Sequence, residues 1–183
     1  SPSTVNEISS ATLSVPLVNI AATFSTVAPA TFSFSMSFGV SFSIPTLKLF
    51  LPLGISDVRW NRVPDGNNEG GCGIHVSSDD IAKLGLLYLH GGVWNGKRLL
   101  SEAWVKEATS PISDNSCNGT PDWCAGYGYQ FWVNAREGFR GDGAFGQLCV
   151  VLPEHDMVFA LQTELGNMQA EMDWLMELAD HIH

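Results

Sequence analysis

Positive charge is scarce in this sequence: 9 of its 183 residues are Lys or Arg, against 19 Asp plus Glu, which gives a formal net charge of −10. An acidic chain repels phosphate backbones and anionic lipid headgroups, so the composition disfavours nucleic acid and membrane surfaces as partners. The apolar content, 45%, is ordinary for a soluble globular protein. The length suits one domain with a core of its own.

Cysteine and histidine lack the spacings that metal sites and redox pairs need. The four cysteines form no CxxC pair, and no two histidines stand at metal-ligand spacing, so we predict neither a metal nor another cofactor. We expect four free thiols in a reducing compartment; the alternative is a bridge between Cys117 and Cys124, if the loop between them folds back.

A signal peptide is also missing, because no basic stretch precedes an apolar run and the first residue is Ser1. This leaves the compartment open and slightly favours the cytoplasm. We expect the chain to be a fragment or a processed form of a longer protein.

The first 46 residues differ from the rest. Residues 8–47 contain no charge, and residues 32–44 alternate apolar and small side chains, which is the pattern of a β-strand. Interrupting prolines and many hydroxyl groups disfavour a transmembrane helix. Three interpretations remain: a pair of strands, a disordered lead, or a stretch foreign to the following domain, such as a shifted reading frame. The abrupt break favours the third, so we treat residues 1–46 as a segment of uncertain status and 47–183 as the domain.

Helix signals follow in the second part. Ser77, with Asp80 three residues later, predicts a helix start, and the glycines at 91–92 predict its end. An Asn-Gly turn is expected at 95–96. Ser101 predicts the cap of a second, short helix over 102–108.

Strand signals come next, over residues 127–133, 146–152 and 157–163, with a turn at 153–156. A last helix is predicted after Asn167. Its apolar side chains share one face that suits packing on a sheet: Met168, Met172, Leu175, Ala179 and Ile182. The fold class predicted is therefore α+β, an antiparallel β-sheet with packed helices.

Four segments, in order, resemble the C-terminal part of class C β-lactamase-related serine hydrolases, a family that includes penicillin-binding DD-peptidases, esterases and amidases. They read LFLPLGISDVRW, then GGCGIHVSSDDIAKLGLLYLHGGVWNGKRLLSEAWVKEATSP, then GYGYQFW, then RGDGAFGQLCVVLPEHDMVFAL. The resemblance covers residues 47–180, roughly three quarters of the chain. It implies a partial β-lactamase/transpeptidase-like fold, whose sheet the C-terminal helix covers and to which N-terminal strands are added.

The resemblance also implies acyl transfer by a serine in Ser-x-x-Lys, with a third motif, Lys/His-Thr/Ser-Gly, on a strand that lines the site. The sequence Gly141-Asp142-Gly143 stands at this third motif. The resemblance places the N–H of Ala144 at the oxyanion-hole donor position, so Gly143 and Ala144 are given a supporting catalytic role. Asp142, Phe145 and Gly146 are assigned to substrate binding.

The basic residue of the third motif is missing. Gly141 stands at its place, and Arg140, one residue earlier, could supply the charge only if the strand bulges. A glycine-rich hairpin turn before a buried strand is the alternative interpretation of this stretch.

The nucleophile is absent too: the sequence contains no Ser-x-x-Lys and no Tyr-x-Asn. Residues 113–115 spell the Ser-Asp-Asn motif of class A β-lactamases, but they lie too close to the third motif, and we interpret this as coincidence. The resemblance therefore implies the C-terminal portion of a serine hydrolase acting on an amide, ester or β-lactam, inactive alone.

Two alternatives stay open. The first is a non-catalytic binding or interaction module for a small molecule, and the second is a truncated gene product without a function of its own. If residues 1–46 do not complete the sheet, one edge stays open and the chain is expected to self-associate.

Overall fold

The computed structural model describes residues 46–69, 72–115 and 119–182, so the predicted strand segment at 32–44 lies outside the described residues. In chain order the elements are η1 (Thr46–Phe50), β1 (Arg59–Trp60), β2 (Ile74–His75), α2 (Ser78–Leu89), β3 (Val93–Trp94), β4 (Lys97–Arg98), α3 (Glu102–Ala108), α4 (Pro121–Cys124), β5 (Trp132–Val133), β6 (Phe139–Gly143), β7 (Gln147–Leu152), β8 (Met157–Gln162) and α5 (Met168–Ile182).

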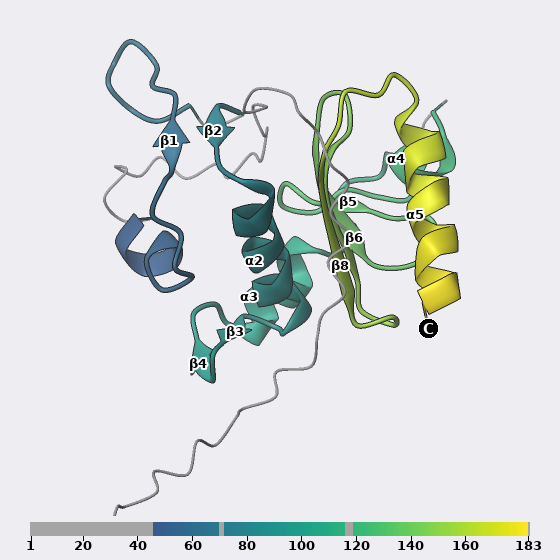
Figure 1. Ribbon diagram of the computed structural model, residues 1–183, viewed down its shortest axis with the longest axis horizontal. Helices are drawn as coiled ribbons and strands as arrows, with labels where there is room; N and C mark the ends of the chain where they lie inside the picture. The colour runs from purple at the N-terminus through teal and green to yellow at the C-terminus, as the bar shows by residue number, and fades with distance from the viewer. Residues whose placement is uncertain (1–45, 70–71, 116–118, 183) are drawn as a thin grey trace, which may run out of the picture.

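A four-stranded antiparallel sheet, in the order β5-β6-β7-β8, forms the centre of the domain. Helix α2 packs on one face and α5 on the other (Figure 1). Successive side chains of a strand point to opposite faces. Cys149, Val151 and Val158 therefore belong to the core under α2, whereas Val150 and Phe159 belong to the core under α5. The predicted α+β fold, with the last helix on the sheet, is confirmed.

Capping side chains fix the helix starts where the sequence predicts them. The Ser77 hydroxyl accepts a hydrogen bond from the N–H of Asp80 at 3.2 Å, and the Ser101 hydroxyl accepts one from the N–H of Trp104 at 3.1 Å. Asn167 Oδ1 accepts one from the N–H of Ala170 at 3.2 Å. Each bond satisfies a backbone donor that the first turn of a helix cannot pair internally.

The strand predicted over 127–133 is wrong for most of its length. Only β5 is a strand there, and Tyr127 makes isolated bridges to Ser113 and Trp132. Gln130 lies between them with φ of +67°, a left-handed conformation that interrupts an extended chain. The apolar alternation of this stretch therefore reflects aromatic packing more than continuous pairing.

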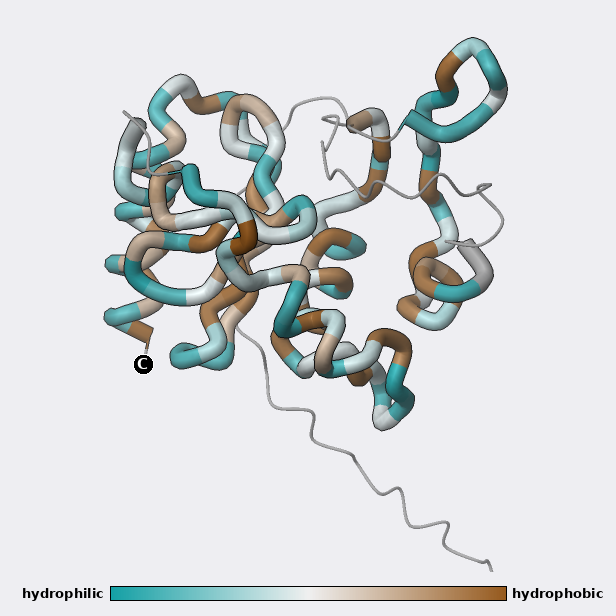
Figure 2. The backbone as a smooth tube through the Cα atoms, turned by 180° about the vertical axis from the view of Figure 1, so that it is seen from behind, coloured by the Kyte–Doolittle hydropathy of each residue, from teal (hydrophilic) through white to brown (hydrophobic). Residues whose placement is uncertain are grey.

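The apolar face of α5 is confirmed in its middle and wrong at its end. Met172, Leu175 and Ala179 are buried against the sheet, Met168 is partly buried, and Ile182 is exposed. Figure 2 shows hydrophilic residues recurring along this helix, on its outer side near the C-terminus. The last turn of the helix thus extends beyond the core.

The thiol prediction needs a correction. Cys124, at the end of α4, is disulfide-bonded, so the expectation of four free thiols is wrong. Cys72 and Cys149 are free, and Cys117 lies outside the described residues. Among the described helices none is long and apolar enough to cross a bilayer.

His155, in the turn between β7 and β8, links two other segments of the chain. Its Nδ1 lies 3.1 Å from Glu137 Oε1, and its Nε2 lies 3.3 Å from Asp180 Oδ1. Asp180 also binds Arg136 at 2.9 Å. The hydrogen bond to Glu137 raises the pKa of His155, and the bond from Arg136 lowers the pKa of Asp180.

The His155 cluster makes stability depend on pH. The raised pKa of His155 means that its contribution is complete below the pKa of an unfolded histidine, about 6.5, and is lost as the pH rises through the folded pKa. The lowered pKa of Asp180 acts in the opposite direction, because its contribution is lost as the pH falls through that pKa. We expect His155→Gln to lower the Tm more at about pH 5.5 than at about pH 8.5. Thermal unfolding at both values measures this, with His90→Gln as the control; an equal loss at both would contradict it.

Candidate functional site

The strand that carries the predicted third motif, β6, is regular. Each residue of β6 pairs with β7 in unbroken register, from Phe139 opposite Val151 to Gly143 opposite Gln147. No bulge therefore moves Arg140 into the position of the missing basic residue, and Gly141 occupies that position. The strand presents two glycines, Gly141 and Gly143, on the face that lies on the side of α2.

Arg140 lies on the opposite face, fully buried at 0% exposure. Its guanidinium lies 4.2 Å from the ring centroid of Trp123, donates to the carbonyl of Asp122 at 3.0 Å and to Asn134 Oδ1 at 3.0 Å, and pairs with Asp142 at 3.2 Å. These contacts hold the positive charge of Arg140 on the α5 side of the sheet, opposite the face that presents Gly141 and Gly143.

Asp142 is therefore part of a buried ion pair. Burial raises the pKa of Asp142 and lowers that of Arg140, and the attraction between the two groups opposes both shifts. The carboxylate of Asp142 points to Arg140 and to the α5 side. This contact does not test the predicted role of Asp142 in substrate binding, which stays a prediction.

One half of β6 is uncovered along its edge. The short strand β5 pairs only with Phe139 and Arg140, so within the described residues nothing pairs with 141–143 on that side. Ala144 follows directly, is exposed, and makes no hydrogen bond through its N–H within the described part of the chain. An unpaired N–H on an exposed residue at the end of a strand is the kind of group that can bind an anionic oxygen.

Phe145 is the most exposed large apolar residue of the described chain, at 63%, and its φ is +67°. A bulky residue in the left-handed region is strained by its own side chain. The carbonyl of Phe145 accepts a hydrogen bond from the N–H of Leu165 at 3.0 Å, and Leu165 is itself exposed. Two exposed apolar residues, Phe145 and Leu165, are thus joined at the turn that contains Ala144.

Gly146 completes the turn, with φ of +89°. A Cβ at this position would collide with Thr163 Oγ1 and with Glu171 Oε2, so both side chains pack directly against the glycine. The Thr163 hydroxyl lies 2.9 Å from Glu171 Oε1. The structure therefore places Ala144, Phe145 and Gly146 in one turn directly after Gly143, the last residue of β6. It adds Thr163 and Glu171, which were not predicted from the sequence.

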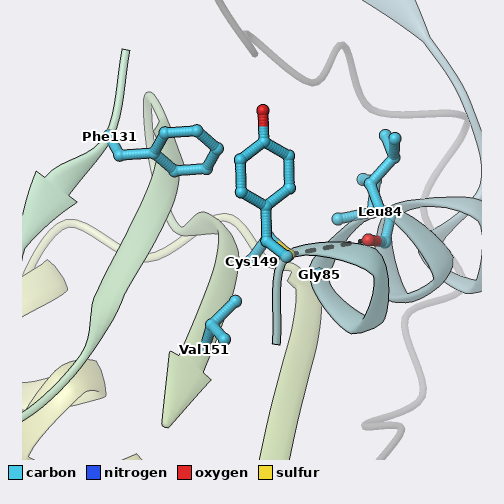
Figure 3. Close-up of a pocket in the computed structure, with 7 residues that line it drawn as sticks. Leu84, Gly85, Phe131, Cys149 and Val151 are labelled. Carbon is cyan, nitrogen blue, oxygen red and sulfur yellow. Dashed lines mark hydrogen bonds between the residues drawn. The ribbon is translucent and has the colours of Figure 1, made fainter. Parts of the chain in front are cut away.

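The apolar cavity in Figure 3 is a packing defect of the core. It measures about 10 Å³ and is enclosed by α2, β7 and Phe131, with Gly85 and Cys149 in contact across it. A volume of this size holds a single water at most, and an apolar lining keeps it dry. Burial raises the pKa of Cys149 to about 12, so its thiol is inert.

A wider hollow of about 310 Å³ lies between residues 111–115 and 124–126. The Ser-Asp-Asn sequence lines it. Two segments of the chain lie between Ser113 and β6. Ser113 forms a bridge with Tyr127, Tyr127 forms one with Trp132, and only Trp132 pairs with Arg140 of β6. Across the described residues no group of three or more His, Cys, Asp or Glu side chains could hold a metal ion.

The sheet order, with one helix on each face, defines a partial β-lactamase/transpeptidase-like fold. A solved structure that it resembles is a protein described as a putative 6-aminohexanoate-dimer hydrolase from Bacillus anthracis, with a TM-score of 0.60 and 19% identity. The match covers 75% of this chain and 37% of that one, so the chain spans little more than a third of the neighbour's length. No family model and no curated protein matches the chain. The likeness confirms the fold predicted from the sequence.

Thr163 and Glu171 left only a weak signal in the sequence. Thr163 directly follows an apolar strand. Glu171 stands four residues before Leu175 and next to Met172, so it interrupts the buried side of α5. A charged residue at such a position, only 6% exposed, usually has a partner or a purpose, because an isolated carboxylate is costly to bury. Helical spacing alone would have identified the position, but not the turn that it contacts.

Proposed function

We propose that this chain is the C-terminal portion of a β-lactamase-related serine hydrolase, which transfers an acyl group from an amide, ester or β-lactam to water. The observation that supports this best is the N–H of Ala144, an exposed residue directly after β6, which makes no hydrogen bond within the part of the chain that the structure describes. Acyl transfer places negative charge on a carbonyl oxygen, and preset N–H donors stabilise that charge. Gly143, without a side chain, lets a ligand approach the backbone closely.

The chain cannot carry out this chemistry by itself. Its sequence has no Ser-x-x-Lys and no Tyr-x-Asn, so the hydroxyl nucleophile and the base that activates it are missing. Removing the nucleophile of a serine hydrolase leaves only residual rate enhancement from oxyanion stabilisation and binding.

The first test is direct. The 183-residue chain, mixed with a fluorescent penicillin or a p-nitrophenyl ester, is expected to show no burst of product and no covalent adduct in its mass spectrum. A complete class C β-lactamase under the same conditions serves as the positive control. A stoichiometric burst from this chain would overturn the proposed inactivity.

Ligand binding tests the site itself. A small ester should raise the Tm of the wild type and of Ala144→Gly, which retains the N–H donor, and should leave the Tm of Ala144→Pro unchanged, because proline has no N–H. Equal shifts in all three proteins would contradict the role of Ala144.

A non-catalytic interaction module is the second candidate, and the outer edge of β8 favours it. This six-residue strand, Met157–Gln162, pairs with β7 on one side and with no described strand on the other. It carries no charge, and uncharged open edges pair readily with other strands. Self-association through this edge is our proposal for the contact, and sedimentation velocity on the same protein distinguishes it from a monomer.

A further inference from the structure

Thr163, just after β8, lies under the turn that carries Ala144. Its hydroxyl oxygen is 2.9 Å from Glu171 Oε1, 3.0 Å from the carbonyl oxygen of Gly146 and 3.3 Å from that of Phe145. A threonine hydroxyl has a single proton to donate. The three acceptors therefore compete for this proton, and only one of them receives it at a time.

The charge state of Glu171 decides that competition. An ionised carboxylate only accepts, so Thr163 must then donate its proton to Glu171, and the two turn carbonyls lose that donor. A protonated Glu171 instead donates its own proton to the Thr163 oxygen. The Thr163 proton is then free for the Gly146 carbonyl, the nearer of the two turn acceptors. One proton bound at Glu171 thus adds one hydrogen bond to the turn.

The surroundings of Glu171 favour the protonated, neutral form of its carboxyl group. The residue is buried, and its Oε2 has no hydrogen-bond partner within the described part of the chain. Burial raises the pKa of Glu171, the negative charge of Asp142 raises it further, and the Thr163 hydrogen bond lowers it.

Charged groups reach this region from three elements. Asp142 and Arg140 come from β6 and form an ion pair with each other. Asp122 of α4 binds Gln169 of α5 at 2.6 Å, and Gln169 also binds Asp173. Of these groups, Asp142 is the one whose charge acts on Glu171, so its own titration has to be separated from that of Glu171 in any test.

We propose that Glu171 is a positioning residue: through the hydroxyl of Thr163, its protonation switches a hydrogen bond to the Gly146 carbonyl and so sets the geometry of the turn that presents Ala144. The importance of Ala144 rests on the proposed function. The switch itself concerns only the turn and exists whether or not the turn binds a ligand.

Nuclear magnetic resonance of the full chain tests this switch. The reporters are the carbonyl ¹³C of Gly146 and the amide ¹⁵N of Gln147, which follows that carbonyl. Between about pH 4 and about pH 8, a range that includes ordinary and raised glutamate pKa values, both should shift with the midpoint of the Glu171 side-chain carboxyl. Glu171→Gln should abolish this pH-dependent transition. Any shift that remains in this variant and follows the titration of the Asp142 carboxyl is assigned to Asp142.

Thr163→Val removes the hydroxyl at almost constant shape. In this variant the Glu171 carboxyl should still titrate while the Gly146 and Gln147 signals no longer follow it. Glu177→Gln, on the exposed side of the same helix, is the matched control and should leave the transition unchanged. A Gly146 transition that keeps the wild-type midpoint in Glu171→Gln or in Thr163→Val overturns the proposal, as does the absence of any transition in the wild type.

The outcomes for the switch and for the function are separable. A transition that behaves as expected, in a chain that binds no ester, would keep the switch and overturn the proposed function. Ester binding that depends on Ala144, without a Glu171 transition at Gly146, would keep the function and overturn the switch.

Discussion

Replacing Arg140 with alanine is expected to lower the free energy of unfolding by about 3–5 kcal/mol, the usual result of removing one partner of a buried ion pair. Asp142 would be left with a buried, uncompensated charge, and Asn134 Oδ1 and the Asp122 carbonyl would lose their donor. The guanidinium also fills the space beside Trp123, so a void adds to the loss. Denaturant unfolding measures the change.

Two variants separate charge from packing at this position. Arg136→Ala removes an exposed arginine with a carboxylate partner, Asp180, and should cost far less than Arg140→Ala, because water screens the pair. Arg140→Met combined with Asp142→Leu removes both charges at similar volume and should be more stable than Arg140→Ala alone. An Arg140→Ala protein as stable as the wild type would show that this pair is not needed.

Local signals explain what the sequence could predict about the fold. A cap needs only the residues at the start of its helix, so Ser77 and Ser101 identified α2 and α3 without tertiary information. The strand β6 gave no such signal, because Gly141 and Gly143 interrupt its apolar alternation and only the resemblance marked it as a strand. Over residues 127–133 the alternating pattern was present, but the left-handed Gln130 interrupts the strand and leaves only β5. A backbone angle of that kind cannot be read from side-chain periodicity.

The candidate site divides in the same way. Gly143 to Gly146 are consecutive, so a motif can identify them together. Thr163 and Glu171 reach that turn only because β8 and α5 return to it. Helical spacing marks Glu171 as a charged residue on the buried side of α5, but it does not identify the turn that the residue contacts. Arg140 was considered as a charge for the site, but its burial between Trp123 and the sheet depends on the packing of α4, four residues that no pattern identified.

Gly138→Ala is expected to cost about 2–5 kcal/mol, as the sum of a left-handed backbone, about 1–2 kcal/mol, and an overpacked contact, about 1–3 kcal/mol. Gly138 has φ of +70° in the turn that leads into β6, and a Cβ there would collide with the backbone carbonyl of Val151 and lie 3.0 Å from Pro153 Cδ. A backbone atom within a sheet cannot move aside as a side chain can, so the strand pair itself must shift.

Two other glycines isolate the terms of that sum. Gly66 has φ of +87°, and a Cβ at this position would have no atom within 4 Å, so Gly66→Ala should cost only the backbone term, about 1–2 kcal/mol. Gly166 has free space and no left-handed φ, so Gly166→Ala should change stability little, within about 0.5 kcal/mol. Equilibrium unfolding of the three variants gives the steric term by difference; equal losses in Gly138→Ala and Gly66→Ala would contradict it.

The loss of stability in Gly138→Ala should not be independent of the loss in Arg140→Ala. The Gly138 carbonyl accepts the N–H of Asn134 at 3.1 Å, and Asn134 Oδ1 in turn accepts a hydrogen bond from Arg140. A displaced turn would therefore weaken the hydrogen bonds that hold the guanidinium. The double variant Gly138→Ala with Arg140→Ala should lose less stability than the sum of the two single variants, because residues that share a hydrogen-bond network do not contribute additively. Strict additivity would mean that the turn and the buried arginine are independent.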